Sequence, residues 1–194
     1  MIEHLEYQHL LIFGSVLVAV WFIVIYFLPR MLLTVFKRAI LVKGFGDGPI
    51  PINTLYIQSQ ALFADPLNTS GSKLMTTGVN RDTLLVVGWL DLRKGPLILH
   101  VPDMHGRYYS VQFTDPSKNT NFAYVGKRTT GTEAGAYLIS GPSWKGAMPQ
   151  GVPQISSPNN SVLVIGRVFV DSNSDLPTAH GLAHQIQLSP LTKP

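Results

Sequence analysis

The chain has 194 residues, enough for one domain with a hydrophobic core plus an appendage. Only 13% of the residues are charged, well below the ~25% of ordinary soluble domains, which indicates that part of the chain lies outside water. The absence of cysteine excludes disulfides, thiolate nucleophiles and cysteine-ligated zinc. The net charge of +4 comes from scattered bases, and their one concentration (Arg30, Lys37, Arg38 and Lys43) adjoins an apolar segment. This distribution favours a membrane surface, and no nucleic-acid partner is expected.

The apolar segment runs from Leu10 to Leu28, LLIFGSVLVAVWFIVIYFL, and carries no charge. Nineteen helical residues span about 28 Å, close to the ~30 Å hydrocarbon core of a bilayer. The competing interpretation is a cleaved signal peptide, but the run is longer than the usual h-region, and no basic n-region or cleavage site flanks it. The sequence therefore predicts a retained single-pass transmembrane helix in the cell membrane. Trp21 and Tyr26 are candidate interfacial anchors, although Trp21 lies near the middle.

Residues 29–43 extend this helix or bend it at Pro29. Lys37 and Arg38 fall together on the polar side of this stretch. The apolar residues recur at helical spacing: Met31, Leu32, Val35, Phe36, Ala39 and Ile40. Two alternatives remain open, an amphipathic helix along the lipid headgroups and a helix packed under the folded domain. We therefore divide the chain into a membrane segment at 1–43 and a globular domain at 44–194.

The side of the membrane is contested by two signals. Glu3 and Glu6 precede the span and the basic residues follow it, so the positive-inside rule favours a cytoplasmic domain. The family resemblance described below favours the opposite side.

Past Gly44 the chain consists of short apolar runs separated by Gly, Pro, Asn and Asp. The runs predict six strands, at 83–92, 96–101, 107–113, 122–125, 136–140 and 161–170. A helix is expected at 52–66, and another at 174–188 with Ser174 or Asp175 as its cap. Many short strands without long intervening helices predict a mainly β fold, an antiparallel sandwich or jelly roll.

Alternation along 107–113 places Tyr108, Ser110 and Gln112 on one face of a strand. These side chains could line a ligand groove. The favoured alternative is that the face packs against a neighbouring sheet or a partner subunit.

Histidines form two local groups. His100, Asp103 and His105 form the first group, but the two histidines are five residues apart across a turn and no later histidine completes a metal site. His180 and His184 are four residues apart on the predicted C-terminal helix and have no acidic neighbour to complete a site. No Gly-x-Ser-x-Gly elbow, paired carboxylates or phosphate-binding glycine loop is present. We therefore expect no metal and no cofactor, and assign no catalytic residue.

The most polar stretch of the domain is Asn80-Arg81-Asp82-Thr83, directly before the apolar run LLVVGWL. Asp82 could accept hydrogen bonds from backbone amides while Arg81 pairs with a carboxylate such as Asp91 or Asp115. The strand that follows has almost no polar alternation, so both of its faces should be buried. We interpret the four residues as the anchoring corner of that strand, with a ligand pocket as the alternative.

The motifs NRDT, WLDL, KGP, VPDMHGRYYSVQFTD, GKRTTGTEAG, YLISGPSWKG and SPNNSVLVIGR occur in order between about Ile52 and Leu188. In them the chain resembles the bacterial domain-of-unknown-function family 1254. The signature of that family maps onto Asn80, Arg81, Asp82, Thr83, Trp89, Asp91, Arg107, Tyr108, Tyr109, Arg128, Trp144 and Arg167. The chain departs from it at Leu85 to Val87, where relatives carry Tyr and Ser, and at His105 and Ala136, where Gly and Asp are common.

The resemblance implies a jelly-roll fold and an exported, extracytoplasmic domain. In longer relatives a second jelly roll, the family 1214 domain, follows; it is absent here, so the expected partner is a separate family-1214-like protein, a second copy of the chain or a larger membrane complex. The family has no established activity. The expected function is a membrane-anchored structural, assembly or accessory subunit. The alternative is an extracytoplasmic enzyme or a carbohydrate- or lipid-binding domain with a polar pocket near Asp82, Tyr108 and Arg128.

Overall fold

The computed structural model describes residues 2–44, 48–58 and 82–191. By its internal contacts the chain divides into two compact units, Met1–Arg38 and Ala39–Pro194. The first unit consists of most of one long helix. The second holds the last turn of that helix and every described strand.

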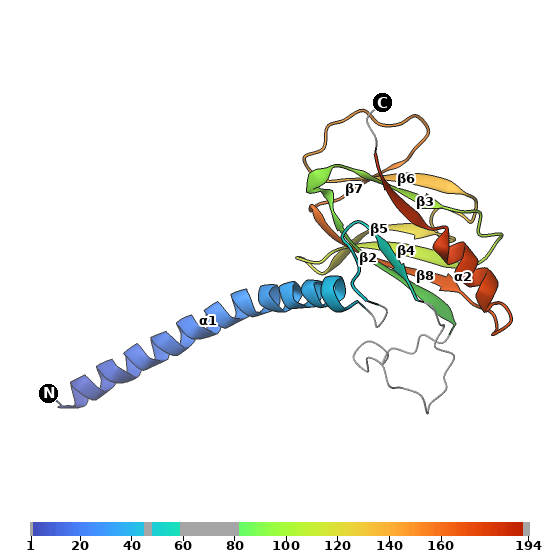
Figure 1. Ribbon diagram of the computed structural model, residues 1–194. Helices are drawn as coiled ribbons and strands as arrows, with labels where there is room; N and C mark the ends of the chain where they lie inside the picture. The colour runs from blue at the N-terminus through green and yellow to red at the C-terminus, as the bar shows by residue number, and fades with distance from the viewer. Residues whose placement is uncertain (1, 45–47, 59–81, 192–194) are drawn as a thin grey trace. The chain divides into compact units, whose positions relative to one another are not determined.

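The long helix, α1, runs from Ile2 to Lys43 and continues through Pro29 (Figure 1). Proline has no N–H group, so it cannot donate to the carbonyl of residue 25. Side chains bind the backbone carbonyls next to this gap: the Arg30 guanidinium donates to the Tyr26 carbonyl at 2.5 Å, and the Thr34 hydroxyl donates to the Arg30 carbonyl at 2.8 Å. The helix is continuous across the proline, and two side chains bind its carbonyls close to that position.

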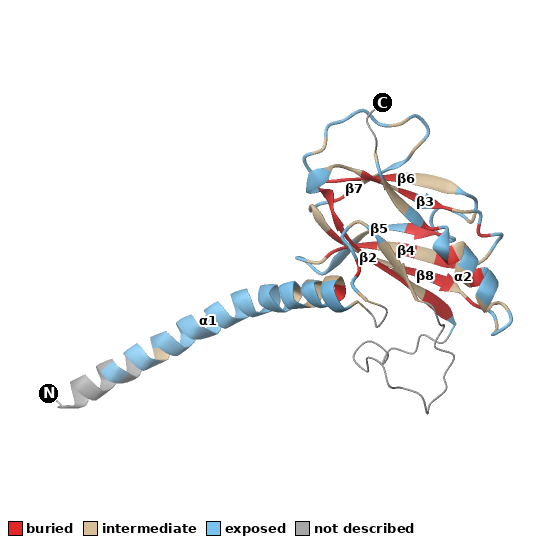
Figure 2. Ribbon diagram, in the orientation of Figure 1, coloured by how far each residue is buried: buried red, intermediate tan, exposed pale blue. Residues whose placement is uncertain are grey.

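The apolar part of α1 is exposed around its whole circumference (Figure 2). Its most apolar stretch, within Ile12–Lys43, has a mean hydropathy of 2.4, and none of that stretch is buried. The prediction of one N-terminal helix long and apolar enough to cross a membrane is confirmed.

The last turn of α1, from Ala39, belongs to the unit that contains the sheets. Ile40 in this turn is buried, and Gly44 ends the helix with a positive φ of 61° while its N–H donates to the Ile40 carbonyl. Glycine adopts this backbone conformation without steric cost. Ile40 is thus buried within the unit that contains the sheets, while both interpretations of residues 29–38 stay predictions.

In the described part of the chain, nine strands form two sheets. The first has the order β1-β2-β8-β4-β5, all antiparallel: Leu55–Ile57, Thr83–Asp91, Ser161–Phe169, Tyr109–Asp115 and Thr120–Gly126. The second has the order β7-β6-β3-β9, antiparallel except for the parallel pair β6–β7: Gln154–Ser156, Gly135–Ser140, Leu97–Val101 and Gln187–Pro190. A short 3-10 turn, η1 (Leu92–Lys94), follows β2, and helix α2 (Leu176–His184) lies between β8 and β9.

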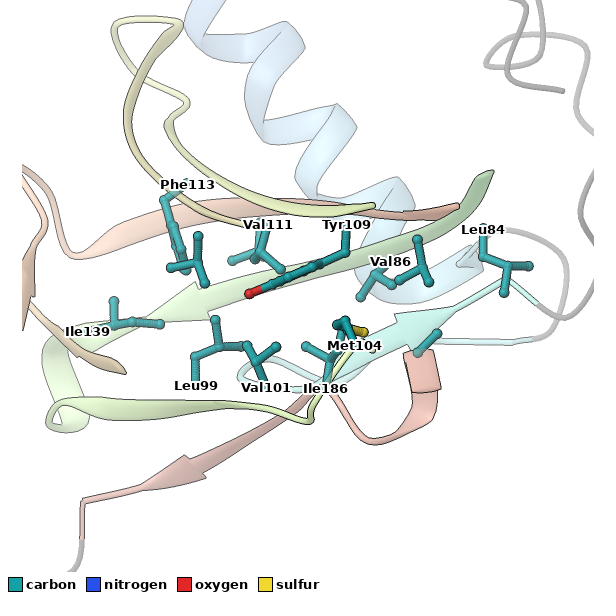
Figure 3. Packing of buried hydrophobic residues seen from close by; sticks show 14 of the residues in the cluster. Leu84, Val86, Leu99, Val101, Met104, Tyr109, Val111, Phe113, Ile139 and Ile186 are labelled. Carbon is teal, nitrogen blue, oxygen red and sulfur yellow. The ribbon is translucent and has the colours of Figure 1, made fainter. Parts of the chain in front are cut away.

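The core lies between the two sheets. Strand β4 directs Tyr109, Val111 and Phe113 toward Leu99 and Val101 of β3 (Figure 3). These side chains come from alternate positions because successive residues of a strand point to opposite faces. From α2, Ala179 and Ala183 are fully buried in the same cluster, where their small size lets the helix approach the strands closely.

Strand β2 is buried along nearly its whole length, as the unbroken apolar run predicted. Leu84, Val86 and Leu90 belong to the core cluster between the sheets, whereas Trp89, on the opposite face, is 1% exposed and donates its indole N–H to the Ser161 hydroxyl at 2.8 Å. Both faces of this strand are therefore covered.

The prediction of a mainly β domain behind one long apolar helix is confirmed, and the six predicted strands correspond to β2, β3, β4, β5, β6 and β8. Two predicted helices need correction. The helix expected at 52–66 is wrong at Leu55–Ile57, which forms β1 and pairs with β2; residues 59–66 lie outside the described part. The helix expected at 174–188 ends at His184, because Gln187–Pro190 pairs with β3 as β9.

Candidate functional site

A cleft of about 880 Å³ lies where the β3–β4 loop faces helix α2. Residues from four parts of the chain line it: the β3–β4 loop with Tyr108, the turn after β5, the end of β8 with the loop that follows, and α2. Its polar side chains carry both charges and several hydroxyls: His105, Arg107, Lys127, Asp171, Asp175, Tyr108, Ser172, Ser174 and Thr178.

The cleft contains a bidentate ion pair between Arg107 and Asp175. The two guanidinium NH groups donate to the two carboxylate oxygens at 2.5 and 2.6 Å, and the side chains are only 15% and 19% exposed. Arg107 also donates to the Phe169 carbonyl at 2.7 Å, and Asp175 accepts the Asp171 backbone N–H at 3.0 Å. These bonds attach the start of α2 to the beginning of β4 and the end of β8.

The ion pair shifts the protonation of both partners. Hydrogen bonding from Arg107 lowers the pKa of Asp175 to about 2, and the same bond raises the pKa of Arg107. The Nε of Arg107 is buried and has no hydrogen-bond partner among the described residues. Both charges are thus committed to each other, and neither is available to act as an acid or base near neutral pH.

The β3–β4 loop makes a tight turn at the edge of the cleft. Asp103 accepts the His105 backbone N–H at 2.7 Å, and His105 and Gly106 both have positive φ, 50° and 76°. Lys127 donates to the Gly106 carbonyl at 2.7 Å from across the cleft. The left-handed conformation of His105 is one that favours glycine.

Tyr108 is the one predicted pocket residue that lines the cleft and also contacts a second predicted residue. The Arg128 guanidinium lies 5.5 Å from the centre of its ring, within the range of a cation–π contact. Asp82, the third predicted pocket residue, does not line the cleft. Asp82 directly precedes β2, and its backbone carbonyl accepts the Val170 N–H at 2.7 Å.

The polar corner before β2 is only partly described. Asn80 and Arg81 lie outside the described residues, so the partner expected for Arg81 stays a prediction. Thr83 is buried, whereas the Asp82 side chain is exposed and makes no hydrogen bond within the described part of the chain. The expected bonds from backbone amides to the Asp82 carboxylate are therefore not observed, and the main chain holds this end of the strand.

Two other predicted residues, Asp91 and Gln112, do not line the cleft. Each bonds to residues near it instead. Asp91 accepts the Arg93 backbone N–H and forms an ion pair with the Arg93 guanidinium at 2.6 Å. Gln112 donates to Thr114 of its own strand and to Asn121 of the neighbouring strand β5, on the face of β4 opposite the core. On this face, Gln112 therefore bonds to side chains of the same sheet.

Arg167, Trp144 and Tyr109 occupy three different settings. Arg167 is exposed on β8, opposite Leu85 and Ser110 in register. Trp144 is half-buried in the long β6–β7 loop. Tyr109 is a core residue between the sheets, and burial raises its pKa.

The two histidine groups also differ. His100 shares a hydrogen bond with the Ser189 hydroxyl at 2.9 Å, while the His105 ring lies 3.4 Å from Asp103, so His100 interacts with β9 and not with the other two. Within residues 2–44, 48–58 and 82–191, no group of three or more His, Cys, Asp or Glu side chains could hold a metal ion. His180 and His184 do lie together, with their Nε2 atoms 3.3 Å apart.

Sequence reasoning missed Asp175 and Lys127 as cleft residues. Ser174 or Asp175 was predicted as the helix cap. Asp175 does occupy the cap position of α2, but its side chain makes no capping bond and binds Arg107, 68 residues away. No local pattern in the sequence indicates such a pairing. Arg107 and Tyr108, both selected from the sequence, were the residues that pointed to this part of the molecule.

The arrangement is suited to binding more than to covalent chemistry. Among the described cleft residues, the hydroxyls of Ser172 and Ser174 share a hydrogen bond with each other at 2.9 Å, and no hydroxyl of these residues bonds to a histidine or carboxylate that could activate it. Tyr108 offers a ring, Lys127 a cation and Asp171 an exposed carboxylate. Such a set can hold a polar ligand.

Comparison with known proteins identifies the family and the fold. A sequence profile of the family described as protein of unknown function, DUF1254, matches residues 58–190. No curated protein matches the chain. The solved structure of the VPA0106 protein from Vibrio parahaemolyticus is similar with a TM-score of 0.63 at 24% identity, over 86% of this chain and 36% of that one. At this identity the likeness shows the fold alone.

A second solved structure, an uncharacterized protein from Burkholderia cenocepacia, has a TM-score of 0.38 at 11% identity, over 71% of this chain and 34% of that one. A score this low carries no argument. The chain spans about a third of the length of each of these proteins. Because the profile matches more than half of the chain and contains the ordered motifs from NRDT to SPNNSVLVIGR, this chain belongs to the DUF1254 family.

Proposed function

We propose that this protein is a single-pass membrane protein whose two-sheet domain is a structural or accessory subunit of a membrane protein complex. The observation that carries the proposal is the exposure of α1. Its large apolar side chains between Ile12 and Leu28 are each at least 42% exposed. Exposed apolar surface of this extent marks a membrane or protein contact, because burying it is worth roughly 25 cal/mol per Å².

The partner we propose is a second β domain of the family 1214 kind, carried by a separate membrane-anchored chain. Its support is the family resemblance, which implies that such a domain accompanies this one in longer relatives; the match covers 36% of the Vibrio protein. A second copy of this chain and a larger complex are the other occupants that an experiment must distinguish.

The finer architecture we propose for the domain is a jelly roll. Its support is the alternation of the chain between sheets: β2 to β3, β3 to β4, β5 to β6, β7 to β8 and β8 to β9 each change sheet. Repeated crossing of this kind is typical of sandwiches built from Greek keys.

Cross-linking in native membranes tests the proposed subunit role. A photoreactive residue at Tyr124, which is 46% exposed on the edge strand β5, should capture a defined partner, and the captured mass distinguishes a second copy from another chain. A photoreactive residue placed instead at the exposed Lys145, in the β6–β7 loop of the other sheet, gives the comparison with Tyr124. A protein that stays monomeric and uncaptured from both positions, and that purifies alone in mild detergent, would overturn the proposal.

A second candidate function, binding of a carbohydrate or lipid headgroup or turnover of a small ligand, is favoured by the cleft. Its volume of about 880 Å³ and its mixture of Tyr108, Lys127 and serine hydroxyls suit a polar ligand. Glycan and lipid arrays probed with wild type and Tyr108→Ala test it, with Lys145→Ala as the control outside the cleft. Binding by the wild type and the control but not by Tyr108→Ala supports this function; absence of binding by the wild type removes it.

A further inference from the structure

Two charged side chains of the cleft have no opposite charge to pair with. Two basic and two acidic residues line the cleft besides His105: Arg107, Lys127, Asp171 and Asp175. Arg107 and Asp175 form the bidentate ion pair and neutralise each other. Lys127 and Asp171 are exposed, and neither forms an ion pair with any described residue. The cleft therefore offers a ligand one cation and one carboxylate.

The strand order of the first sheet places these two charges on opposite sides of β4. On one side, the Phe169 N–H at the end of β8 donates to the Tyr108 carbonyl at 2.9 Å, and Asp171 follows two residues later. On the other side, the Lys127 N–H, directly after β5, donates to the Tyr109 carbonyl at 3.1 Å. Neighbouring strands are about 4.8 Å apart, so the main chain at Lys127 and that at Asp171 are separated by roughly 10 Å. The start of β4 lies between them.

Both residues are held in place and keep their charged groups available. The Lys127 Nζ donates to the Gly106 carbonyl at 2.7 Å, which uses one of its three N–H donors. The Asp171 backbone N–H donates to the Asp175 carboxylate at 3.0 Å, while its own side chain stays exposed. Groups that are already positioned lose less conformational entropy when a ligand binds.

The two charges select the kind of ligand. A simple anion binds Lys127 but leaves Asp171 unpaired, and a simple cation does the reverse. A zwitterion pairs with both, and each charge-assisted hydrogen bond is roughly twice as strong as a neutral one. Ser172 and Ser174, from the same loop as Asp171, add hydroxyl oxygens that can accept hydrogen bonds from an ammonium group.

The chemistry of each end of the ligand can be narrowed further. Lysine binds phosphate as a point charge, whereas a carboxylate is matched best by the fork of an arginine, and Arg107 is already paired with Asp175. A quaternary ammonium has no N–H to donate and favours aromatic faces, and the Tyr108 ring already carries the Arg128 guanidinium at 5.5 Å. The cleft is therefore suited to a phosphate at one end and a primary ammonium at the other.

We propose that the cleft binds a zwitterion of the phosphoethanolamine type, with its phosphate on Lys127 and its primary ammonium on Asp171. This proposal rests on the second candidate function, ligand binding in the cleft. The same chemistry occurs in free phosphoethanolamine and in the headgroup of phosphatidylethanolamine. The cleft volume of about 880 Å³ accommodates the group from either source.

Equilibrium binding to the full chain in a non-ionic detergent, measured by calorimetry, tests the proposal. Phosphoethanolamine should bind at least about 10-fold more tightly than ethanolamine, inorganic phosphate or phosphocholine, because each of these lacks one of the two charge-assisted contacts. Lys127→Met should abolish the preference over ethanolamine, and Asp171→Asn the preference over inorganic phosphate. Lys127→Arg, which keeps the charge, should retain binding. Lys145→Met and Glu133→Gln, at exposed residues that do not line the cleft, are the matched controls and should bind like wild type.

A competition experiment distinguishes the two sources of the group. Phosphatidylethanolamine added to the detergent micelles should displace phosphoethanolamine if the lipid headgroup occupies the cleft, and phosphatidylglycerol should not. Phosphoethanolamine that binds and is not displaced assigns the cleft to the free compound.

Two results would overturn the zwitterion while keeping ligand binding in the cleft. One is binding of ethanolamine or inorganic phosphate as tightly as phosphoethanolamine. The other is binding of a neutral glycan that Tyr108→Ala abolishes and that Lys127→Met and Asp171→Asn leave unchanged. Absence of binding by any of these probes, together with negative glycan and lipid arrays, would overturn the second candidate function as well. Thermal unfolding of each variant confirms that it is folded, as expected for substitutions at exposed residues.

Discussion

At the scale of single residues, the Arg107–Asp175 pair matters most because it joins three elements at one point. In Asp175→Asn the guanidinium keeps its partly buried position but loses its counter-charge. We expect a loss of about 1–3 kcal/mol in the free energy of unfolding, less than for a fully buried pair because both side chains retain some exposure. Urea unfolding in detergent, followed by intrinsic tryptophan fluorescence, measures it, and Glu133→Gln, at an exposed carboxylate that does not line the cleft, is the control.

The same pair predicts how stability depends on acid. The pKa of Asp175 in the folded protein is about 2, below its ordinary value of 3.8. Its contribution is therefore complete above about pH 4 to 5 and is lost as the pH falls toward 2, on the order of 1–2 kcal/mol after allowance for screening. Comparing urea midpoints at pH 6 and pH 3 should show a larger fall for wild type than for Asp175→Asn. Equal falls would mean that other carboxylates, such as the buried Asp115 with its lowered pKa, account for the whole effect.

Tyr109 is a core residue whose hydroxyl is buried without a hydrogen-bond partner among the described residues; the Thr130 hydroxyl lies near it without completing a bond. An unsatisfied buried hydroxyl costs about 1–3 kcal/mol, so Tyr109→Phe should be neutral or stabilising by up to about 1 kcal/mol. Because burial raises the Tyr109 pKa above 10, wild type should lose stability above pH 10, and the variant should lose less. Thermal unfolding at pH 7 and pH 10.5 checks both statements, and a clearly destabilised variant would contradict them.

At the scale of elements, two glycines should respond oppositely to alanine. A Cβ at Gly88 would lie 2.6 Å from the Thr54 carbonyl oxygen, so Gly88→Ala forces β1 away from β2 and should cost about 1–3 kcal/mol. A Cβ at Gly181 meets nothing within 4 Å, and alanine there should stabilise α2 by about 0.5–1 kcal/mol. Urea midpoints of the two variants give the comparison. A stabilising Gly88→Ala would show that β1 pairs less closely than described.

The sequence was informative where one strand or helix carries its own pattern. The unbroken apolar run 84–90 predicted a strand buried on both faces, as the structure has it. The alternation of 107–113 separated Tyr108, Ser110 and Gln112 from the other residues of the strand, but it did not identify which face is buried, and the core takes the opposite set. The sequence failed for β1, β7 and β9, which are three or four residues long, too short for a period to be read. Their strand conformation depends on neighbours supplied by distant parts of the chain.

The cleft could be predicted only in part, for a related reason. Tyr108 and Arg128 were selected and do lie together, but the carboxylate that holds Arg107 follows it by 68 residues. The local sequence around Asp175 indicates a helix start, which is correct, and gives no sign of the ion pair. Long-range pairing of this kind is set by the fold and not by the segment.

At the scale of the whole molecule, the absence of cysteine makes the membrane orientation directly testable. His9→Cys precedes the apolar stretch and Lys145→Cys lies in the β6–β7 loop, and both positions are exposed. With the domain on the extracytoplasmic side, a membrane-impermeant maleimide should label Lys145→Cys in intact cells with the outer membrane permeabilised, and His9→Cys only after lysis. The cysteine-free wild type is the blank, and the reverse labelling pattern would place the domain in the cytoplasm.

The central position of β8 has a consequence for synthesis. β8 pairs with both β2 and β4, yet most of the chain precedes it, with β2 some 70 residues earlier by the register of Leu90 with Val162. While the ribosome is still making residues 92–160, β2 exists as a finished apolar strand with no partner on that side. High contact order of this kind gives folding times of milliseconds to seconds and leaves a nascent chain open to aggregation. An N-terminal helix that reaches the membrane first would keep each unfinished chain separated from its neighbours until residue 169 emerges and the sheet can close.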